Sequence, residues 1–269
     1  MYHKIEKSII PLDNYSRVPN DNFIKPNILS RTELFSVAKT SDISFLNTPI
    51  FRTRSLEIKQ SGPKLNLLDS SVWLYCLYIY RMRDISEKTK INFADMIRII
   101  GGKDNKKSNY KTLRNSIDKL SQTTLEVNYW SKYKTKVRLL YSSDKKRKEN
   151  DRVIYLDENI YKLFLKQEYS NLSIYLRQQL KGDLTKWLYD YVRSHKREQT
   201  MCVGLELLKL LSGSKMTKGE FHRTIKDSFK QLSNLEVVKD VAFNQSKYKQ
   251  QVSWYHIHRK PQYDGDIPF

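Results

Sequence analysis

Side chains that could read the edges of DNA bases are concentrated in one predicted helix, at about residues 110–121. Arginine, lysine and asparagine form paired hydrogen bonds with the major-groove edges of guanine and adenine. At about 100° per residue, Leu113, Ile117 and Leu120 share one face of this helix, so they are expected in the core. The remaining surface and the loop before it carry the candidate DNA-binding residues: Lys107, Ser108, Lys111, Arg114, Asn115 and Lys119.

A second predicted helix, at about residues 217–232, has the same design. Its apolar face is formed by Ile225, Phe229 and Leu232. The opposite face carries Asp227 among basic residues, and further lysines precede the helix. The candidate DNA-binding residues of this second set are Lys215, Lys218, Arg223, Lys226 and Lys230.

The two helices belong to an internal repeat, which is tested first because it constrains the whole architecture. Residues 112–121 align with residues 224–233 without a gap, at an offset of 224 − 112 = 112 positions. Three further matches occur in the same order with offsets between 110 and 114. They pair residues 73–75 with 187–189, 96–100 with 207–211, and 125–127 with 235–237.

Both repeats show the element order of a winged helix, in which three helices precede a β-hairpin. In the first, helices at about 69–80, 93–100 and 110–121 precede strands at 124–129 and 136–141. In the second, helices at about 184–194, 205–211 and 217–232 precede strands at 235–241 and 251–258. Glycines follow the short second helix in each repeat, where helices commonly end. We therefore predict an α+β protein with two tandem winged-helix domains, at residues 51–160 and 161–269.

An extended N-terminal arm is predicted over residues 1–50. This segment contains four prolines and little sustained periodicity. One short helix is expected near residues 31–37, and a strand at 53–59 that Ser61, Gly62 and Pro63 end.

Basic residues also occupy the predicted hairpins, where phosphate or minor-groove contacts are common. A solvated basic loop is the alternative interpretation, above all for the run at 145–148. The hairpin candidates are Lys132, Lys134, Lys136, Lys145, Lys146, Arg147, Lys148, Lys247 and Lys249.

The charge balance favours a polyanionic partner. The chain has 49 Lys and Arg against 29 Asp and Glu, a formal net charge of +20. No apolar stretch approaches the roughly 20 residues that span a bilayer, so a membrane partner is not expected. With two cysteines far apart, neither a disulfide framework nor a cysteine zinc site is expected, and a reducing cytoplasm suits both. No phosphate-binding glycine motif or catalytic triad is found, so we expect no cofactor, metal or catalytic residue.

Two short motifs suggest other activities. His256 and His258 share one face of a predicted strand, as in the metal-binding strand of rolling-circle nickases, but only Tyr263 follows and no carboxylate completes the site. We interpret the pair as part of the last wing strand. Residues 231–235 are similar to peptides that dock on the replicative sliding clamp, although Leu232 and Leu235 are expected in the core.

The chain resembles the TrfA-like plasmid replication initiators, a group of tandem winged-helix proteins. The resemblance rests on residues 26–35, 62–74 and 110–124 and extends over roughly 26–260. It implies binding to direct repeats (iterons) in double-stranded origin DNA, opening of an adjacent AT-rich stretch, and recruitment of the host initiator, helicase and sliding clamp. It also implies that Lys111, Arg114, Asn115, Arg223 and Lys226 read bases and phosphates.

The sequence thus predicts a non-enzymatic, cytoplasmic, plasmid-associated DNA-binding initiator with a site of roughly 20 bp. Homodimerisation is left open. A winged-helix transcriptional repressor would have the same architecture, a rolling-circle nickase would need His256, and a partner-binding structural protein would not bind DNA.

Overall fold

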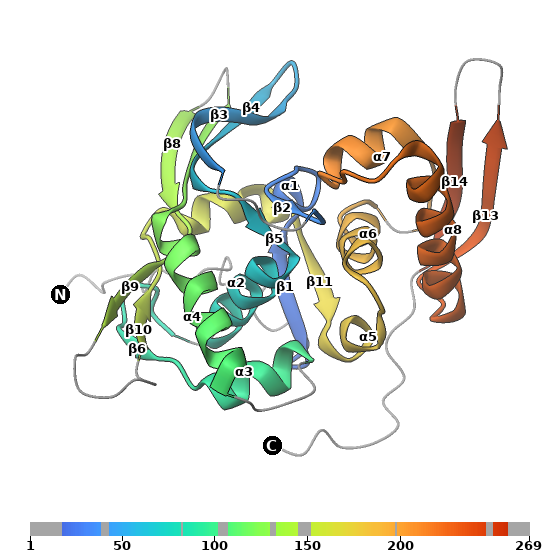
Figure 1. Cartoon of the computed structure of the whole chain (residues 1–269). Coiled ribbons are helices and arrows are strands. Elements are labelled where there is room, and N and C mark those ends of the chain that lie inside the picture. Colours follow the sequence, from blue (N-terminus) through green and yellow to red (C-terminus); the bar gives the residue numbers. More distant parts are fainter. Residues whose placement is uncertain are drawn as a thin grey trace.

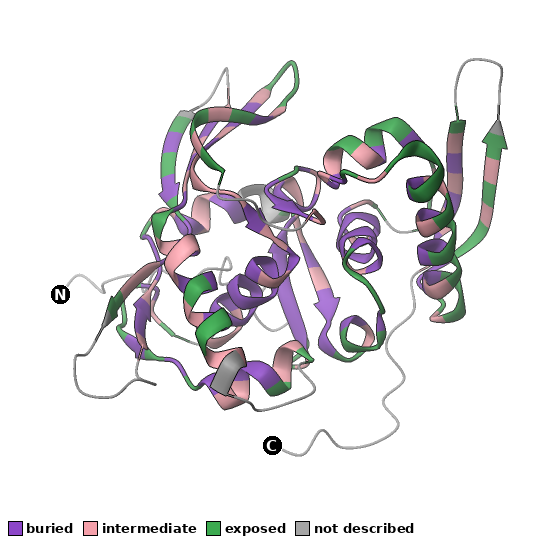
Figure 2. Ribbon diagram, viewed as in Figure 1, coloured by how far each residue is buried: buried purple, intermediate pink, exposed green. Residues whose placement is uncertain are grey.

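Two buried helices, α2 (Leu67–Ile79) and α6 (Asp183–Arg193), lie at the centre of the computed structural model (Figure 1). The structure describes residues 18–38, 43–81, 83–101, 107–129, 133–144, 152–196, 198–245 and 250–257. Asn66 begins α2 with a capping box, in which its side chain accepts hydrogen bonds from the backbone of Leu68 and Asp69. Almost all of α2 and α6 is buried (Figure 2), so their polar side chains must find partners inside the protein.

Two structural units, one in each half of the chain, share one order of elements. In the first, α2 is followed by β6 (Thr89–Lys90), α3 (Phe93–Ile100), α4 (Lys107–Gln122) and, after two inserted strands at residues 124–138, by β9 (Tyr141–Asp144) and β10 (Arg152–Tyr155). In the second, α6 is followed by β12 (Thr200–Gly204), α7 (Leu205–Leu211), α8 (Lys218–Asn234), β13 (Val238–Gln245) and β14 (Gln250–His256). The strand orders β6-β10-β9 and β12-β14-β13 also correspond, and every pair is antiparallel.

Backbone geometry fixes the register of the repeat. Gly101 and Gly213 both have positive φ angles, of 84° and 62°, just after the second helix of each unit. They are 213 − 101 = 112 positions apart, the same offset as the third helices. The predicted match of residues 96–100 with 207–211 is therefore wrong by one position. The error arises because α7 has two exposed leucines, Leu207 (47% exposed) and Leu210 (65%), which the apolar pattern treats as core.

The first unit contains an additional sheet. β3 (Ser44–Arg52), β4 (Leu56–Pro63), β7 (Thr124–Tyr129) and β8 (Tyr133–Arg138) form four strands in that order. The predicted hairpin therefore exists as β7–β8, but the strands that correspond to β13–β14 are β9 and β10. The predicted second strand at 136–141 is interrupted at Leu139 and Leu140. The carbonyl oxygen of Leu139 accepts a hydrogen bond from Trp73 Nε1 at 3.1 Å, and both leucines are buried.

The N-terminal segment is built into the fold. β1 (Asn22–Pro26) is buried and pairs with β11 (Tyr169–Ser173), and β2 (Phe35–Ser36) pairs with β5 (Leu65–Asn66). The prediction of a helix near 31–37 is wrong, because α1 spans Asn27–Ser30. Phe23, Ile24, Leu29 and Phe35 are each 2% exposed or less, so their burial outweighs the prolines around them. Residues 1–17 lie outside the described residues.

The apolar core has two parts. One surrounds Trp73 in the first unit and the other surrounds Trp187 and Trp254 in the second. Phe23 of β1 and Leu74 of α2 pack into the second part, so the N-terminal half contributes to both. A 3-10 helix, η2 (Ile160–Gln167), and α5 (Ile174–Gln179) connect the units, and the predicted boundary at residue 160 stays a prediction. Among the described residues, no helix has the length and apolar character needed to cross a membrane.

Gly62 gives a direct test of this packing. Its φ is 116°, and a Cβ at this position would lie 2.5 Å from the carbonyl oxygen of Gln122. We expect Gly62→Ala to lower the free energy of unfolding by about 1–3 kcal/mol, measured by urea denaturation, because strain and overlap act together. Gly204→Ala is the matched control, since nothing lies within 4 Å of its Cβ position and its φ is −67°. Equal losses in the two variants would contradict this account.

Candidate nucleic-acid interface

Helix α4 has the buried apolar face and the exposed polar face that the sequence predicts. Leu113, Ile117 and Leu120 are 3%, 0% and 0% exposed, while Lys111 and Asn115 are exposed to solvent. Ser116 Oγ donates a hydrogen bond to Asp69 Oδ1 at 2.5 Å, which ties α4 to the buried helix α2. Lys107 and Ser108 begin α4, but their side chains are outside the described part of the chain.

Two candidates on α4 are held by neighbouring side chains. The guanidinium of Arg114 lies 5.8 Å from the ring centroid of Phe93, and Arg114 is half-buried. Lys119 Nζ lies 3.5 Å from Asp69 Oδ2, and its side chain is 28% exposed. Burial raises the pKa of Asp69, and the hydrogen bond from Ser116 and the charge of Lys119 oppose that rise. Lys119 therefore neutralises a buried carboxylate of α2.

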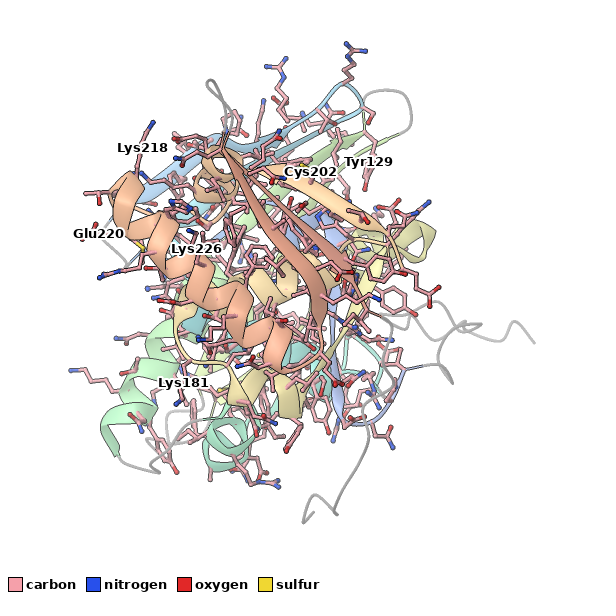
Figure 3. The ribbon with its side chains drawn as sticks, turned by 90° about the vertical axis from the view of Figure 1, so that its right-hand side faces the viewer. Tyr129, Lys181, Cys202, Lys218, Glu220 and Lys226 are labelled. Atoms are coloured by element: carbon pink, nitrogen blue, oxygen red, sulfur yellow. The ribbon has the colours of Figure 1, made fainter. Side chains whose placement is uncertain are left out.

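Helix α8 has the more open face. Ile225, Phe229 and Leu232 are buried, as predicted. The candidates of the second set are all exposed, namely Lys215, Lys218, Arg223, Lys226 and Lys230. Figure 3 shows Lys218 and Glu220 projecting away from the first turns of α8.

Local contacts fix the start and one flank of α8. Thr217 and Glu220 form a capping box at its first turn, where the Thr217 side chain accepts a hydrogen bond from the Glu220 backbone. Lys226 Nζ lies 5.4 Å from the ring centroid of Phe243 on β13, and Lys218 Nζ lies 2.9 Å from Glu206 Oε1 on α7. Both partners of the second pair are well exposed, so solvent screens it and leaves Lys218 able to exchange partners.

The identical serines of the repeat both bond to the first helix of their own unit, at different positions of that helix. Ser228 Oγ of α8 and Thr185 Oγ1 of α6 are hydrogen-bonded at 2.9 Å, as Ser116 of α4 is bonded to Asp69 of α2. Ser116 and Ser228 are 228 − 116 = 112 positions apart. In each unit, the third helix is thus fixed to the buried first helix by a hydroxyl, and its polar face points away from that contact.

The hairpin candidates are described only in part. On β8, Lys136 is exposed and Lys134 Nζ lies 3.0 Å from Glu126 Oε1 of β7. Two basic groups fall between paired strands, one between β9 and β10 and one between β13 and β14. The candidates outside the described residues are Lys132, Lys145, Lys146, Arg147, Lys148, Lys247 and Lys249.

A further basic element was not among the sequence candidates. Arg52 and Arg54 are exposed at the turn that joins β3 to β4, in the sheet that also contains Lys134 and Lys136. The sequence signal for this turn was available, because residues 52–55 precede an alternating segment that begins at Leu56. It was missed since the preceding residues were assigned to an arm.

His256 is a core residue of the second unit. It is 0% exposed on β14, and its Nδ1 lies 3.3 Å from the backbone oxygen of Lys196. Its neighbour His195 is partly buried, and burial, followed by the charge of Arg31, lowers the pKa of His195 to about 4. His258 lies outside the described residues, within which no three His, Cys, Asp or Glu side chains gather as a candidate metal site.

Comparison with known proteins identifies the protein family to which the chain belongs. The chain matches the Replication initiator protein A family over residues 29–234, from α1 to the end of α8, and it belongs to that family. This confirms the resemblance to replication initiators that the sequence shows. The match includes α4 and α8, together with the hydrogen bonds that join them to α2 and α6.

Solved structures show the same fold. The chain is similar to a crystal structure of domains 2 and 3 of RctB, with a TM-score of 0.59 and 16% identity over 87% of this chain and 99% of that one. A second crystal structure of RctB domains 2–3 gives a TM-score of 0.54 and 15% identity over 86% and 96% of the two chains. No curated protein is significantly similar to the chain in sequence.

The contact between Lys119 and Asp69 predicts a difference between two lysines of α4. Lys119→Met should lower the free energy of unfolding by about 1 kcal/mol at neutral pH, whereas Lys111→Met, at an exposed position, should change it little. The contribution of Lys119 requires ionised Asp69. It is therefore present above the pKa of Asp69 and is lost as the pH falls through that value, which is raised above its usual range. Urea denaturation between pH 7 and pH 3 would show this, and a difference that persists undiminished at pH 3 would refute it.

Proposed function

We propose that this replication initiator binds origin DNA through two tandem winged-helix domains and reads direct repeats of double-stranded DNA with α4 and α8. The observation that carries the proposal is the repetition of one outward polar face on two equivalent helices, in a chain of net charge +20. Membership of the initiator family supports the replication role. We infer that the protein acts without an enzymatic step of its own and on a plasmid origin.

The strand orders support the winged-helix interpretation. In the first unit β10 pairs with β6, the strand before the second helix, and with β9, and in the second unit β14 pairs in the same way with β12 and β13. The third helix of such a unit enters the major groove, and the hairpin that follows contacts the backbone or minor groove. On this interpretation the wings are the paired strands β9–β10 and β13–β14, and the basic groups at 145–148 and at Lys247 and Lys249 lie between these strands in the sequence.

The positions of the side chains separate residues that would contact bases from residues that would contact phosphates. Lys111, Asn115 and Arg223 are exposed on the outward faces and have the donors and acceptors that base edges match. Arg114 and Lys226 lie against aromatic rings on the flanks, where they would reach phosphates. Lys134, Lys215, Lys218 and Lys230 would add phosphate contacts that carry no sequence information.

The placement of the helices suits one duplex. Figure 1 separates α4 and α8 across the width of the molecule, and Figure 3 shows both along the same side of it. A duplex along that side would offer them successive major-groove faces about one helical turn apart, so a site of roughly 20 bp is expected.

Recruitment of the host initiator, helicase and sliding clamp is proposed from the resemblance alone. The clamp-like residues 231–235 do not support a direct clamp contact in this state. Leu232 is 0% exposed in the core and Leu235 packs against it. A transcriptional repressor would bind DNA in the same way, and a replication assay on a plasmid that carries the binding site separates the two functions.

The base-reading assignment predicts changes in specificity. A binding site is first selected from random double-stranded DNA with the wild-type protein. Asn115→Ala and Arg223→Ala should then each cost about 1–3 kcal/mol on that site and relax the preference at a few positions, while affinity for unrelated DNA stays nearly unchanged. Arg83→Ala, at an exposed arginine outside both helices, is the control. Equal losses on specific and unrelated DNA would show that these residues do not read bases.

The basic run at 145–148 predicts the opposite behaviour. Replacing all four residues with serine should weaken binding to every sequence alike and flatten the dependence of affinity on salt, because phosphate contacts release counterions. Affinity measured between 50 and 200 mM salt would show it. An unchanged slope would remove the run from the interface.

A further inference from the structure

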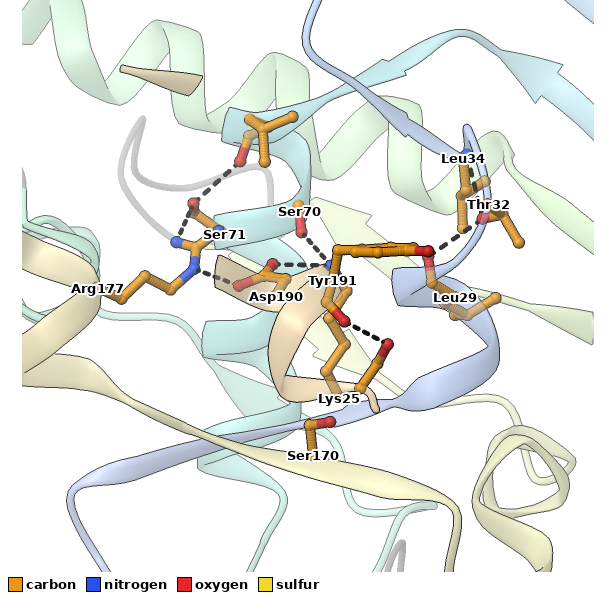
Figure 4. Close-up of polar contacts among 12 residues, drawn as sticks. Lys25, Leu29, Thr32, Leu34, Ser70, Ser71, Ser170, Arg177, Asp190 and Tyr191 are labelled. Atoms are coloured by element: carbon orange, nitrogen blue, oxygen red, sulfur yellow. Dashed lines mark hydrogen bonds and ion pairs between the residues drawn. The ribbon is translucent and has the colours of Figure 1, made fainter. Parts of the chain in front are cut away.

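A buried ionic cluster lies between the two units (Figure 4). Lys25 Nζ of β1 lies 2.9 Å from Asp190 Oδ2 of α6, and Arg177 Nε of α5 lies 3.2 Å from Asp190 Oδ1. The three side chains are each 2% exposed or less. Both oxygens of one carboxylate are therefore held by cations from two other elements.

The same two cations reach the first unit. Arg177 Nη1 donates a hydrogen bond to Ser71 Oγ at 2.9 Å, and Lys25 Nζ donates to Ser70 Oγ at 3.4 Å. Ser70 and Ser71 are adjacent on α2, and both are buried. The cluster is thus a bridge of directional contacts from α2 to α6.

The cluster does not belong to the repeated fold. With the offset of 187 − 73 = 114 that aligns the tryptophans of the first helices, Asp190 aligns with Cys76, which packs as an apolar residue at 0% exposure. An apolar side chain thus suffices at this position for one unit to fold. Burying charges is costly, and burial does oppose ionisation of Asp190. The charges of Lys25 and Arg177 outweigh that effect and hold the pKa of Asp190 below its usual range.

The bridge is continuous with both outward helices. The hydrogen bond from Ser116 to Asp69 joins α4 to α2, and that between Thr185 and Ser228 joins α6 to α8. Apolar contacts between α2 and α6 resist separation but impose little direction, whereas hydrogen bonds to a carboxylate fix an angle.

We propose that Asp190, with Lys25 and Arg177, fixes the distance and rotational phase between α4 and α8, and so sets the spacing that the protein requires between its two half-sites. The proposal rests on the proposed function. Asp190 is a positioning residue in this account and does not contact DNA. Adding one base pair between half-sites moves them by about 3.4 Å and rotates them by about 35°, which a rigid joint cannot follow.

The test measures how sharply binding depends on spacing. The probes are duplexes that carry the selected site, the same site with one or two base pairs inserted or removed at its centre, and each half-site alone. The wild-type protein should lose at least about tenfold in affinity for a change of one base pair, since one of its two helices must leave its groove.

Two variants loosen the bridge in different ways. Ser70→Ala with Ser71→Ala keeps the ionic triad and removes its bonds to α2, whereas Lys25→Met, Arg177→Met and Asp190→Leu together replace the triad with apolar side chains of similar size. In both, we expect the penalty for one base pair to fall to about threefold or less, with half-site affinity unchanged. Ser212→Ala is the matched control, because that buried hydroxyl bonds within its own unit, to the carbonyl oxygen of Lys209.

The outcomes separate the two proposals. A serine variant that is folded by circular dichroism and retains the wild-type dependence on spacing overturns the role of the cluster. A wild-type protein that binds no selected DNA, or binds each half-site as tightly as the whole, overturns the proposed mode of DNA binding instead.

Discussion

The architecture depends on two carboxylates that are buried on its central helices, Asp69 on α2 and Asp190 on α6. A buried carboxylate is stable only when charges and hydrogen bonds replace the water it has lost. Asp69 is satisfied by Ser116 and Lys119 of α4 together with the backbone of Asn66, and Asp190 by Lys25 and Arg177. The same contacts that make burial tolerable therefore position the outer helix of the first unit and join the two units.

Satisfaction of buried polar groups also explains which side chains are left for a ligand. On α4, Lys119 is engaged with the core, so Lys111 and Asn115 carry the outward face. On α8, where Ser228 meets a neutral threonine, no basic residue is needed inside, and Arg223, Lys226 and Lys230 all remain on the surface. The two helices share the sequence pattern of the repeat but expose different side chains. This difference suits two half-sites of different sequence. The additional sheet of β3, β4, β7 and β8 increases this asymmetry, because it adds basic strands to the first unit alone.

Local pattern was enough to predict the three main helices of each unit, the repeat and the buried faces of α4 and α8, since these depend on helical periodicity within short segments. It failed where distant segments meet. The pairing of β1 with β11 joins residues that are between 169 − 26 = 143 and 173 − 22 = 151 positions apart, and nothing in residues 22–26 alone distinguishes a buried strand from an arm. The correspondence of β9–β10 with β13–β14 was hidden by the inserted hairpin at 124–138. Lys25 and Arg177 were not recognised because a lysine or arginine is expected at the surface, and only the fold reveals the carboxylate between them.

The central claim is that two equivalent helices read two successive major-groove faces of one duplex. Chemical footprinting on the selected site tests it most directly, with methylation of guanine N7 reporting the major groove and hydroxyl radicals reporting the backbone. The account predicts two protected major-groove segments on one side of the DNA, about one helical turn apart, within roughly 20 bp. Protection of a single groove segment, or of two segments on opposite sides of the duplex, would contradict it.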